Sequence, residues 1–231
     1  ETASKKVDLL GSADYQMLMN EMAANAGKDP YFPTVSSVNT DWQKELQNKN
    51  APIMNHKGSL SGGTDNSTYY ASFGYVKQEG IYAKGHADYE RYNVRLNYNN
   101  VLLDTKSRNW LNKISFGAIA SYSKSIQTGN TIGNSEAAGL ITSMNMLPPT
   151  EPVYQTDPAI LEQYAVTYPN HVIAPNGLAY NIIEMREITN PLAAMQVSHN
   201  QRTMPQNFGA NFNLDVDLLP GLKFKTTYGA E

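Results

Sequence analysis

The stretch that decides the fold lies between residues 91 and 122, and it reads RYNVRLNYNN over 91–100 and KISFGAIASY over 113–122. In the first run every second residue is apolar or aromatic: Tyr92, Val94, Leu96 and Tyr98. The residues between them are polar: Arg91, Asn93, Arg95 and Asn97. A period of two predicts a β-strand, because successive side chains point to opposite faces. Such a strand separates two solvents, and its apolar face meets either a protein core or lipid.

The composition excludes several classes of protein. A chain of 231 residues with 41% hydrophobic content has room for one large domain or two small ones. The net charge of -3 indicates no strong attraction to nucleic acid or to anionic membrane surfaces. The absence of cysteine excludes disulfides, thiolate metal sites and cysteine catalysis. No window approaches 18 consecutive apolar residues, which excludes a transmembrane helix but leaves a transmembrane strand possible.

The same alternation recurs along the chain. Strands are expected over 55–63, 68–78, 89–100, 112–126, 207–218 and 222–229. In the fifth of these, one face carries Phe208, Ala210, Phe212, Leu214, Val216 and Leu218. The other face carries Asn207, Gly209, Asn211, Asn213, Asp215 and Asp217.

Helical patterns are few. A helix is expected over 12–26, capped by Ser12, with an apolar stripe of Tyr15, Leu18, Met19 and Met22. A second begins at Thr40, where Gln43 completes a capping box. The segment 127–205 reads as long and irregular, and seven of the 12 prolines lie between Pro148 and Pro191. One helix is expected in it over 135–146, with a stripe of Ala137, Leu140, Ile141 and Met144.

The connections between strands differ in length at the two ends of the expected sheet. If the strands alternate in direction, the short connections TDNS, DTKSRNW and LPG fall at one end, and 79–88 and 127–205 fall at the other. Short turns on one rim and long loops on the other are typical of outer-membrane barrels. We therefore expect an all-β fold with minor helical loops, forming about six to eight strands of a large antiparallel transmembrane β-barrel. The expected segments are 1–52 (loop with short helices), 53–126 (strands), 127–205 (long extracellular loop) and 206–231 (hairpin).

A soluble antiparallel sandwich is the alternative, since its strands also have one apolar and one polar face. Three features favour the membrane barrel. The strands are near ten residues or longer, against a usual length of about five to six. Tyr92 and Tyr98 bracket an apolar run, as interfacial aromatic residues do. The loop lengths are the third feature, and together they leave both folds open.

Several local motifs occur together in a fixed order. They are NTDWQ at 39–43, SLSGG at 59–63, TYYASFGYVKQEGI at 68–81 and ERYNVRLN at 90–97. These resemble the SusC/RagA family of TonB-dependent outer-membrane transporters. The resemblance extends to LLGSADYQMLMNE at 9–21, MLPPTEPVY at 146–154, NPLA at 190–193 and GLKFKTTYG at 221–229. It therefore covers nearly the whole chain.

The resemblance implies a 22-stranded barrel in the bacterial outer membrane, plugged by an N-terminal domain. It also implies import of oligosaccharides or peptides, driven through TonB, with a SusD-like surface lipoprotein as partner. The chain contains no plug and no TonB-contacting segment, so no residue here is assigned to energy coupling. We expect both ends to be cuts inside a longer protein.

In such a barrel the two strand faces meet different surroundings. The residues expected to face the lumen are Arg91, Asn93, Arg95, Asn97, Asn211, Asn213, Asp215 and Asp217. The residues expected to contact the lipid bilayer are Tyr92, Val94, Leu96, Phe208, Phe212 and Leu214.

The long segment 127–205 supplies the candidate ligand-binding residues. They are Tyr154, Tyr164, Tyr168, Tyr180, Asn170, Asn176 and Asn181. Aromatic faces accept the apolar side of a sugar ring, and amides bind hydroxyl groups. The alternative is that these tyrosines pack the loop against its neighbours.

No catalytic or metal-binding residues are predicted, and no cofactor. Asp215 and Asp217 are two residues apart, which strand alternation explains without catalysis. The histidines, His56, His86, His171 and His199, are far apart and lack the spacings of metal ligands. We therefore expect a transporter and not an enzyme, with a soluble carbohydrate-binding β-domain or a passive porin-type barrel as competing interpretations.

Overall fold

The computed structural model describes residues 5–105, 110–129, 139–183, 185, 188–198 and 200–231. The chain divides into two compact units. The first unit is made of Glu1–Ala51, Glu79–Asp88 and Thr128–Arg202, and the second of Pro52–Gln78, Tyr89–Gln127 and Thr203–Glu231. The first residues of the expected helix over 135–146, Ala137 among them, lie outside the described part of the chain.

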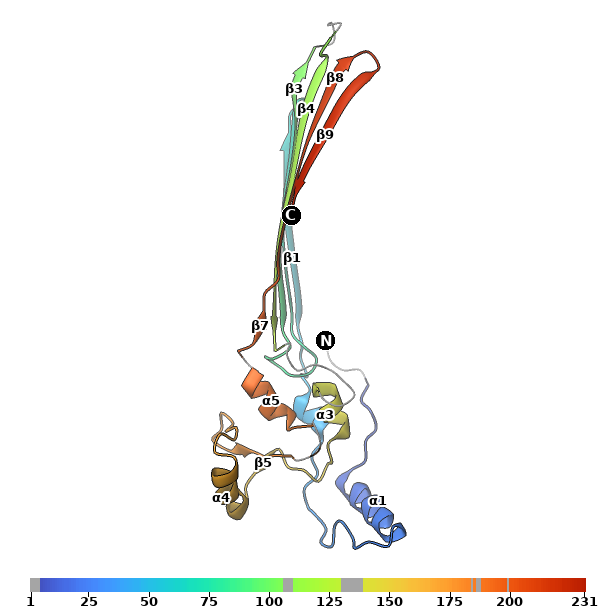
Figure 1. Cartoon of the computed structure of the whole chain (residues 1–231), viewed down its shortest axis with the longest axis vertical. Helices are drawn as coiled ribbons and strands as arrows, with labels where there is room; N and C mark the ends of the chain where they lie inside the picture. The colour runs from blue at the N-terminus through green and yellow to red at the C-terminus, as the bar shows by residue number, and fades with distance from the viewer. Residues whose placement is uncertain (1–4, 106–109, 130–138, 184, 186–187, 199) are drawn as a thin grey trace. The chain divides into compact units, whose positions relative to one another are not determined.

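The second unit is an antiparallel sheet (Figure 1). Its strands follow the order β1 (Ile53–Gly63), β2 (Ser67–Gln78), β3 (Tyr89–Asp104), β4 (Lys113–Thr128), β8 (Gln206–Leu219) and β9 (Leu222–Ala230). The short β7 (Arg202–Thr203) also pairs with β4. Among the described residues the sheet is open, with β1 and β9 as its edges. The prediction of a mainly antiparallel β fold with few helices is confirmed.

The strands are long and regularly paired. β3 and β4 have 16 residues each, and their register is continuous except for a bulge between Val101 and Leu103. The connections at one end are short. β8 and β9 are joined by Pro220 and Gly221, and Gly221 adopts a φ of 83°, as the third residue of a type II turn requires. The chain leaves the sheet for its long connections at the opposite end, as expected.

The first unit contains short helices and one small hairpin (Figure 1). The helices are α1 (Ser12–Asn25), α2 (Trp42–Leu46), α3 (Leu140–Met146), α4 (Pro158–Thr167) and α5 (Pro191–Ser198), and the hairpin pairs β5 (Tyr154–Gln155) with β6 (Ala179–Tyr180). No helix in the described part of the chain is long and apolar enough to span a membrane. The expectation of an irregular 127–205 segment with a single helix is wrong, because α4, α5 and the hairpin were missed. Asp157 caps α4, and Pro158 occupies its first turn, which is a standard start signal.

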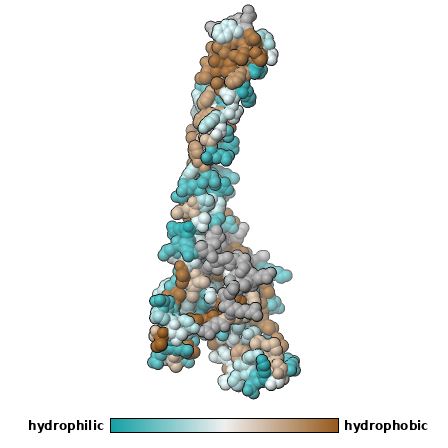
Figure 2. All heavy atoms as spheres, in the orientation of Figure 1, coloured by the Kyte–Doolittle hydropathy of each residue, from teal (hydrophilic) through white to brown (hydrophobic). Residues whose placement is uncertain are grey.

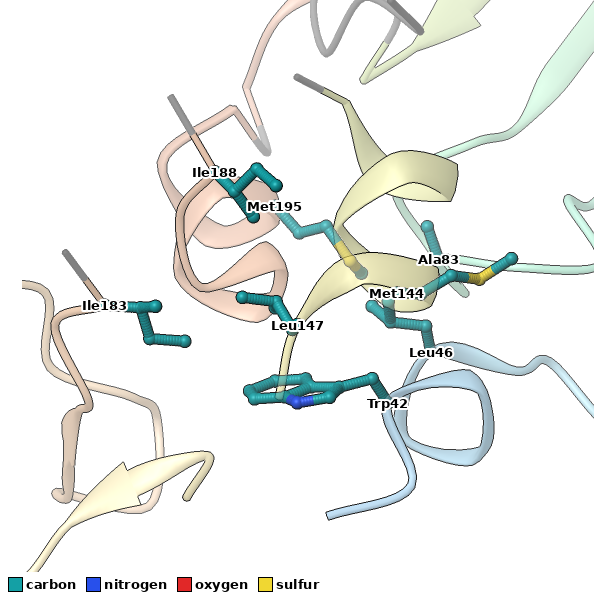
Figure 3. Packing of buried hydrophobic residues seen from close by; sticks show 8 residues of the cluster. All are labelled: Trp42, Leu46, Ala83, Met144, Leu147, Ile183, Ile188 and Met195. Carbon is teal, nitrogen blue, oxygen red and sulfur yellow. The ribbon is translucent and has the colours of Figure 1, made fainter. Parts of the chain in front are cut away.

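A small hydrophobic core joins α2, α3 and α5 (Figure 3). It consists of Trp42, Leu46, Ala83, Met144, Leu147, Ile183, Ile188 and Met195. Trp42 is 2% exposed, and its indole Nε1 donates a hydrogen bond to the carbonyl oxygen of Pro148 at 3.1 Å. The NTDWQ motif therefore ties the start of the chain to the segment after α3.

The helix caps differ from the predicted ones. Asp41, not Thr40, caps α2, since its carboxylate accepts a hydrogen bond from the Lys44 amide at 3.0 Å. Gln43 does not complete a capping box. Its amide group instead binds both backbone groups of Val7, at 3.0 and 2.8 Å.

The first helix is packed on its polar side. Ser12 is its first residue and not its cap, and the Oδ1 of Asn39 accepts a hydrogen bond from the Ser12 amide at 3.0 Å. Gln16 is buried and binds the backbone of Ser36 through both ends of its amide. In the predicted apolar stripe, Leu18 is 44% exposed and Met22 is 52% exposed. Tyr15 and Met19 of the same stripe are half-buried, and Tyr15 packs edge-on against Phe32 at 6.1 Å, so the stripe packs in part.

Candidate functional site

The sheet of the second unit has two chemically different faces, and its register aligns each face across the strands. Val94 lies opposite Phe73 on one side and Tyr122 on the other, and Tyr122 lies opposite Phe208. Tyr98 is aligned in the same way with Ala118 and Phe212. The residues predicted to contact lipid therefore share one face of the sheet, which we call the apolar face. They are Tyr92, Val94, Leu96, Phe208, Phe212 and Leu214.

The apolar face is not covered by described residues. Val94 is 38% exposed, Leu96 is 51% exposed and Phe212 is 43% exposed. A soluble sandwich would bury these side chains against a second sheet or a layer of helices. No second layer of described residues packs on them. Figure 2 shows one side of the molecule, with hydrophobic residues gathered at the turn end of the sheet.

At its loop end, the apolar face finishes with two tyrosine rings, and an ion pair follows them. The rings of Tyr75 and Tyr92 lie 5.0 Å apart. The hydroxyl of Tyr92 donates to a carboxylate oxygen of Glu90 at 3.2 Å, and Lys77 pairs with the same carboxylate at 3.4 Å. This is the order expected where a lipid-facing strand leaves the hydrocarbon: aromatic ring, then ion pair.

The apolar band shifts along the strands from one side of the sheet to the other. On β2 it runs from Tyr75 to Tyr69. The residue of β8 that is aligned with Tyr75, through Tyr92 and Lys124, is the polar Gln206. On β8 the band begins two residues later, at Phe208, and it continues to Val216, four residues beyond the position aligned with Tyr69.

This shift is measured at the loop end of the band. At the turn end, Leu103 of β3 lies beyond the bulge and is aligned through Ile114 with Val216, so the band reaches the same level on β3 and β8. At the loop end the edge moves by two residues, or about 7 Å, over three strand spacings of about 4.8 Å each. This edge of the apolar band is therefore inclined by about 25° to the direction of the hydrogen bonds. A membrane plane that cuts tilted strands produces an incline of this kind.

The opposite, polar face carries the residues predicted to face a lumen: Arg91, Asn93, Arg95, Asn97, Asn211, Asn213, Asp215 and Asp217. Near the turns its charges are paired across β8 and β9. Asp215 pairs with Lys225 at 3.4 Å, and Asp217 pairs with Lys223 at 3.3 Å. Asn213 donates to Asp215 at 3.2 Å. These contacts account for the two aspartates without a catalytic role.

The first unit contains a pocket of about 420 Å³ between α5 and the segments around residues 170 and 181. Four of the predicted ligand-binding residues line it: Tyr168, Asn170, Tyr180 and Asn181. His171 and Asn190 also line it and were not predicted to bind ligand. Asn190 belongs to the NPLA motif, so that motif was the available signal. Burial and the neighbouring Tyr154 raise the pKa of Tyr180, so its phenol stays protonated at neutral pH.

Two of the predicted ligand-binding residues have their polar atoms engaged inside the protein. The Oδ1 of Asn181 accepts hydrogen bonds from the Tyr164 hydroxyl at 3.1 Å and from Gln155 at 3.3 Å. Its Nδ2 donates to Glu151 at 2.9 Å. The amide of Ile182 donates to the Tyr164 hydroxyl at 3.0 Å. Asn181 and Tyr164 therefore hold the wall of the pocket in place.

The remaining two candidates lie outside the pocket lining. The ring of Tyr154 stacks on Tyr180 at 5.2 Å and supports it from behind. The Oδ1 of Asn176 accepts from the Leu178 amide at 3.1 Å and shapes the turn before β6. The pocket thus brings together Tyr168, Asn170 and His171 in its lining.

The described residues contain no cluster of three or more side chains that could hold a metal ion. The described histidines, His56, His86 and His171, lie in different segments. His199 lies outside the described residues.

Comparison with known proteins shows which proteins the chain is similar to. No family model matches the chain. The chain is 28% identical over 226 residues to the TonB-dependent receptor P3 of Formosa agariphila, covering 96% of this chain and 19% of that protein. It is 23% identical over 233 residues to the TonB-dependent receptor SusC of Bacteroides thetaiotaomicron, covering 98% of this chain and 21% of SusC.

Solved structures show the same fold. The RagAB peptide transporter matches with a TM-score of 0.54 and 21% identity, over 94% of this chain and 22% of the matched chain. The open-open state of the RagAB peptide importer matches with a TM-score of 0.56 and 19% identity, over 96% and 25%. The chain thus spans about a fifth of the length of the curated relatives it matches. Its sequence and fold are similar to those of this portion of a TonB-dependent receptor of the SusC/RagA type.

Proposed function

We propose that this chain forms part of the wall of a TonB-dependent importer in the bacterial outer membrane. Its apolar face contacts the lipid, and its polar face lines a water-filled lumen. The observation that carries the proposal is the inclined apolar band. A protein core has no reason to follow an edge inclined by about 25° across the strands, whereas a bilayer imposes such an incline on every tilted strand.

The polar face has the chemistry of a wet lumen. Its arginines and asparagines are exposed or half-buried, and they need no buried partners if water fills the space before them. The Nδ2 of Asn99 donates a hydrogen bond to the Oδ1 of Asn97 at 3.2 Å. Both amides keep further hydrogen-bonding capacity for water or a solute. The alternating chemistry of β3 then follows from its two solvents.

We further propose that the pocket of the first unit contributes to ligand capture at the extracellular side. A largely apolar pocket with a few polar groups is the usual form of a ligand site. Tyr168 offers an aromatic face, and Asn170 and His171 offer hydrogen bonds. An oligosaccharide or a peptide would suit these groups. In this proposal a SusD-like lipoprotein covers the extracellular side, and TonB drives import through other parts of the protein.

Adjacent cysteine substitutions on β3 test the placement of the faces. In the intact transporter reconstituted in lipid vesicles, Asn97→Cys should react with a charged maleimide. Leu96→Cys should resist that reagent until detergent or denaturant removes the lipid. The two positions differ by one residue on one strand, so local backbone motion affects both alike. Equal labelling of both, or preferential labelling of Leu96→Cys, would refute the proposed facing.

A further inference from the structure

The polar face divides into two halves by charge. In the half near the turns, Asp215 and Asp217 pair with Lys225 and Lys223. In the half near the long connections, the charged side chains that β1, β2, β3, β4 and β8 place on this face are all cations: Lys57 of β1 and Arg91 and Arg95 of β3. We call these three residues the cationic patch. The asymmetry means that the lumen proposed above has a positive region away from its turn end.

The register brings the members of the cationic patch together. Asn93 lies between Arg91 and Arg95 along β3, and Lys57 is aligned with Asn93 through Gly74 of β2. The two arginine Cα atoms are about 13 Å apart, from four steps of about 3.3 Å along the strand. Lys57 lies about 10 Å from Asn93, across two strand spacings.

The cationic patch has no acidic partner among the described residues. No carboxylate there lies within 4.0 Å of Lys57, Arg91 or Arg95. The Nε of Arg91 donates to the neutral Oδ1 of Asn93 at 2.8 Å. Glu90 is next to Arg91 in sequence, but it points to the apolar face, where it pairs with Lys77.

There is open space above the arginines. A hollow of about 660 Å³ is lined by Arg91, Asn93, Arg95 and the small residues Ser121, Ser123 and Gly209. Both arginines are exposed. Glu231 lines the far side of the same hollow, one residue beyond the paired Ala230. The backbone of Glu231 lies three strand spacings from that of β3, or about 14 Å. This separation is too large for a direct ion pair with the arginines of β3.

From this arrangement we propose that the cationic patch binds carboxylate or sulfate groups of the transported ligand, so that the importer selects anionic cargo. The inference rests on the proposed function, because it needs the polar face to line the lumen. A guanidinium group presents a planar fork that matches a carboxylate or a sulfate with two parallel hydrogen bonds. Cations of one sign along a confined wall also raise the local concentration of anions.

Binding of short anionic probes to the intact transporter in detergent micelles tests the inference. Tetragalacturonate and tetra-aspartate carry carboxylates on a sugar and on a peptide backbone. Fully methyl-esterified tetragalacturonate and tetra-asparagine are their neutral counterparts. We expect at least one anionic probe to bind more tightly than its neutral counterpart. Arg91→Gln combined with Arg95→Gln should weaken that binding by about tenfold, because charge-assisted hydrogen bonds are lost.

A matched control removes two cations elsewhere on the same face. Lys223→Gln combined with Lys225→Gln changes the net charge equally, but at about 20 Å from the arginines, which is beyond the screening length at physiological salt. It should change the affinity less than about twofold. The inference is overturned if the two double variants weaken binding equally, if the arginine variant binds as the unchanged protein does, or if no anionic probe is preferred.

Cysteine labelling and probe binding together separate the inference from the proposed function. If Asn97→Cys is labelled and Leu96→Cys is protected while the arginine variant keeps its affinity, the wall placement stands and anion selection fails. If the labelling is reversed, the lumen itself is misplaced and the proposed function fails. Cysteine labelling therefore reports on the faces, and probe binding reports on the arginines.

Discussion

The placement of Leu96 in lipid predicts a stability cost that can be worked out from the sheet. Leu96 lies on β3 within the apolar run that Tyr92 and Tyr98 bracket, and it is 51% exposed. It is about 7 Å along the strand from Tyr98 and about 13 Å from Tyr92. For a tilt of about 40°, these become depths of about 5 Å and 10 Å below the two boundaries.

An arginine at this depth should be costly but not prohibitive. The cost of arginine on a lipid-facing strand is about 2–4 kcal/mol at the midplane and about 0–1 kcal/mol near the interface. Leu96→Arg should therefore destabilise the protein by about 2 kcal/mol, or about 30-fold in the unfolding equilibrium constant. Asn97→Arg lies on the polar face, which lines the lumen in the proposed wall, and should cost less than about 0.5 kcal/mol.

The measurement is guanidinium unfolding of the intact transporter in lipid vesicles. The folded fraction is read from the heat-modifiable migration of the protein in gels. Two results would refute the reasoning. If Asn97→Arg costs as much as Leu96→Arg or more, the faces are reversed. Leu96→Arg costing above about 5 kcal/mol would also refute it, since that is the scale of an unpaired charge inside a protein core.

Two further predictions follow from the band and from the loop pocket. On β8 the band runs from Phe208 to Val216, so Leu214 lies inside it and Gln206 lies outside its loop end. Leu214→Arg should cost about 2 kcal/mol in the same assay and Gln206→Arg less than about 1 kcal/mol, and equal costs would contradict this edge of the band. Tyr164→Phe removes the hydroxyl that binds Asn181 and the Ile182 amide. The free energy of local opening around Ile182 should fall by about 1–3 kcal/mol, which is measured as faster amide hydrogen exchange. Tyr31→Phe, at an exposed tyrosine, is the control. Unchanged exchange at Ile182 would show that the Tyr164 hydroxyl does not hold the pocket wall.

The sheet was predictable because each of its strands repeats the same simple pattern. The expected strand 89–100 continues to Asp104 in β3, and 207–218 corresponds to β8 within one residue at each end. Alternation is a local property, since the side chains of a strand meet its two surroundings in turn. The extension of β3 past residue 100 was missed because the bulge between Val101 and Leu103 shifts the phase of the alternation.

The loops were less predictable because distant residues satisfy their polar groups. Ser12 and the Thr40–Gln43 pair have the local signature of helix caps. Asn39 caps the first helix instead, and Gln43 is engaged by Val7, 36 residues away. Neither contact leaves a signal in the neighbouring sequence. The helix α4 did have one, Asp157 followed by Pro158, but it lay in a stretch that its prolines marked as irregular.

The candidate ligand residues show the same limit. Residue type alone indicated Tyr164 and Tyr168 equally, and Asn170 and Asn181 equally. The structure separates them by hydrogen bonding: Asn181 is 4% exposed and has partners on both amide atoms, whereas Asn170 lines the pocket from an exposed position. Which asparagine lines the pocket from an exposed position depends on the fold of residues 150–190 as a whole.

The contrast between sheet and loops has one physical cause. In the proposed wall, each strand of the sheet lies between lipid and water, which differ strongly in polarity, so alternation is favoured along the strand, and a register error of one residue would reverse both faces. The loop unit has one small core around Trp42, and much of its order comes from buried amides such as Gln16 and Asn181. An amide finds its partner wherever the chain returns, so its position carries little information about its neighbours in sequence. The alternation of β3 and the incline of the apolar band are therefore the firmest basis for the wall placement, and the pocket depends on contacts that only the folded chain reveals.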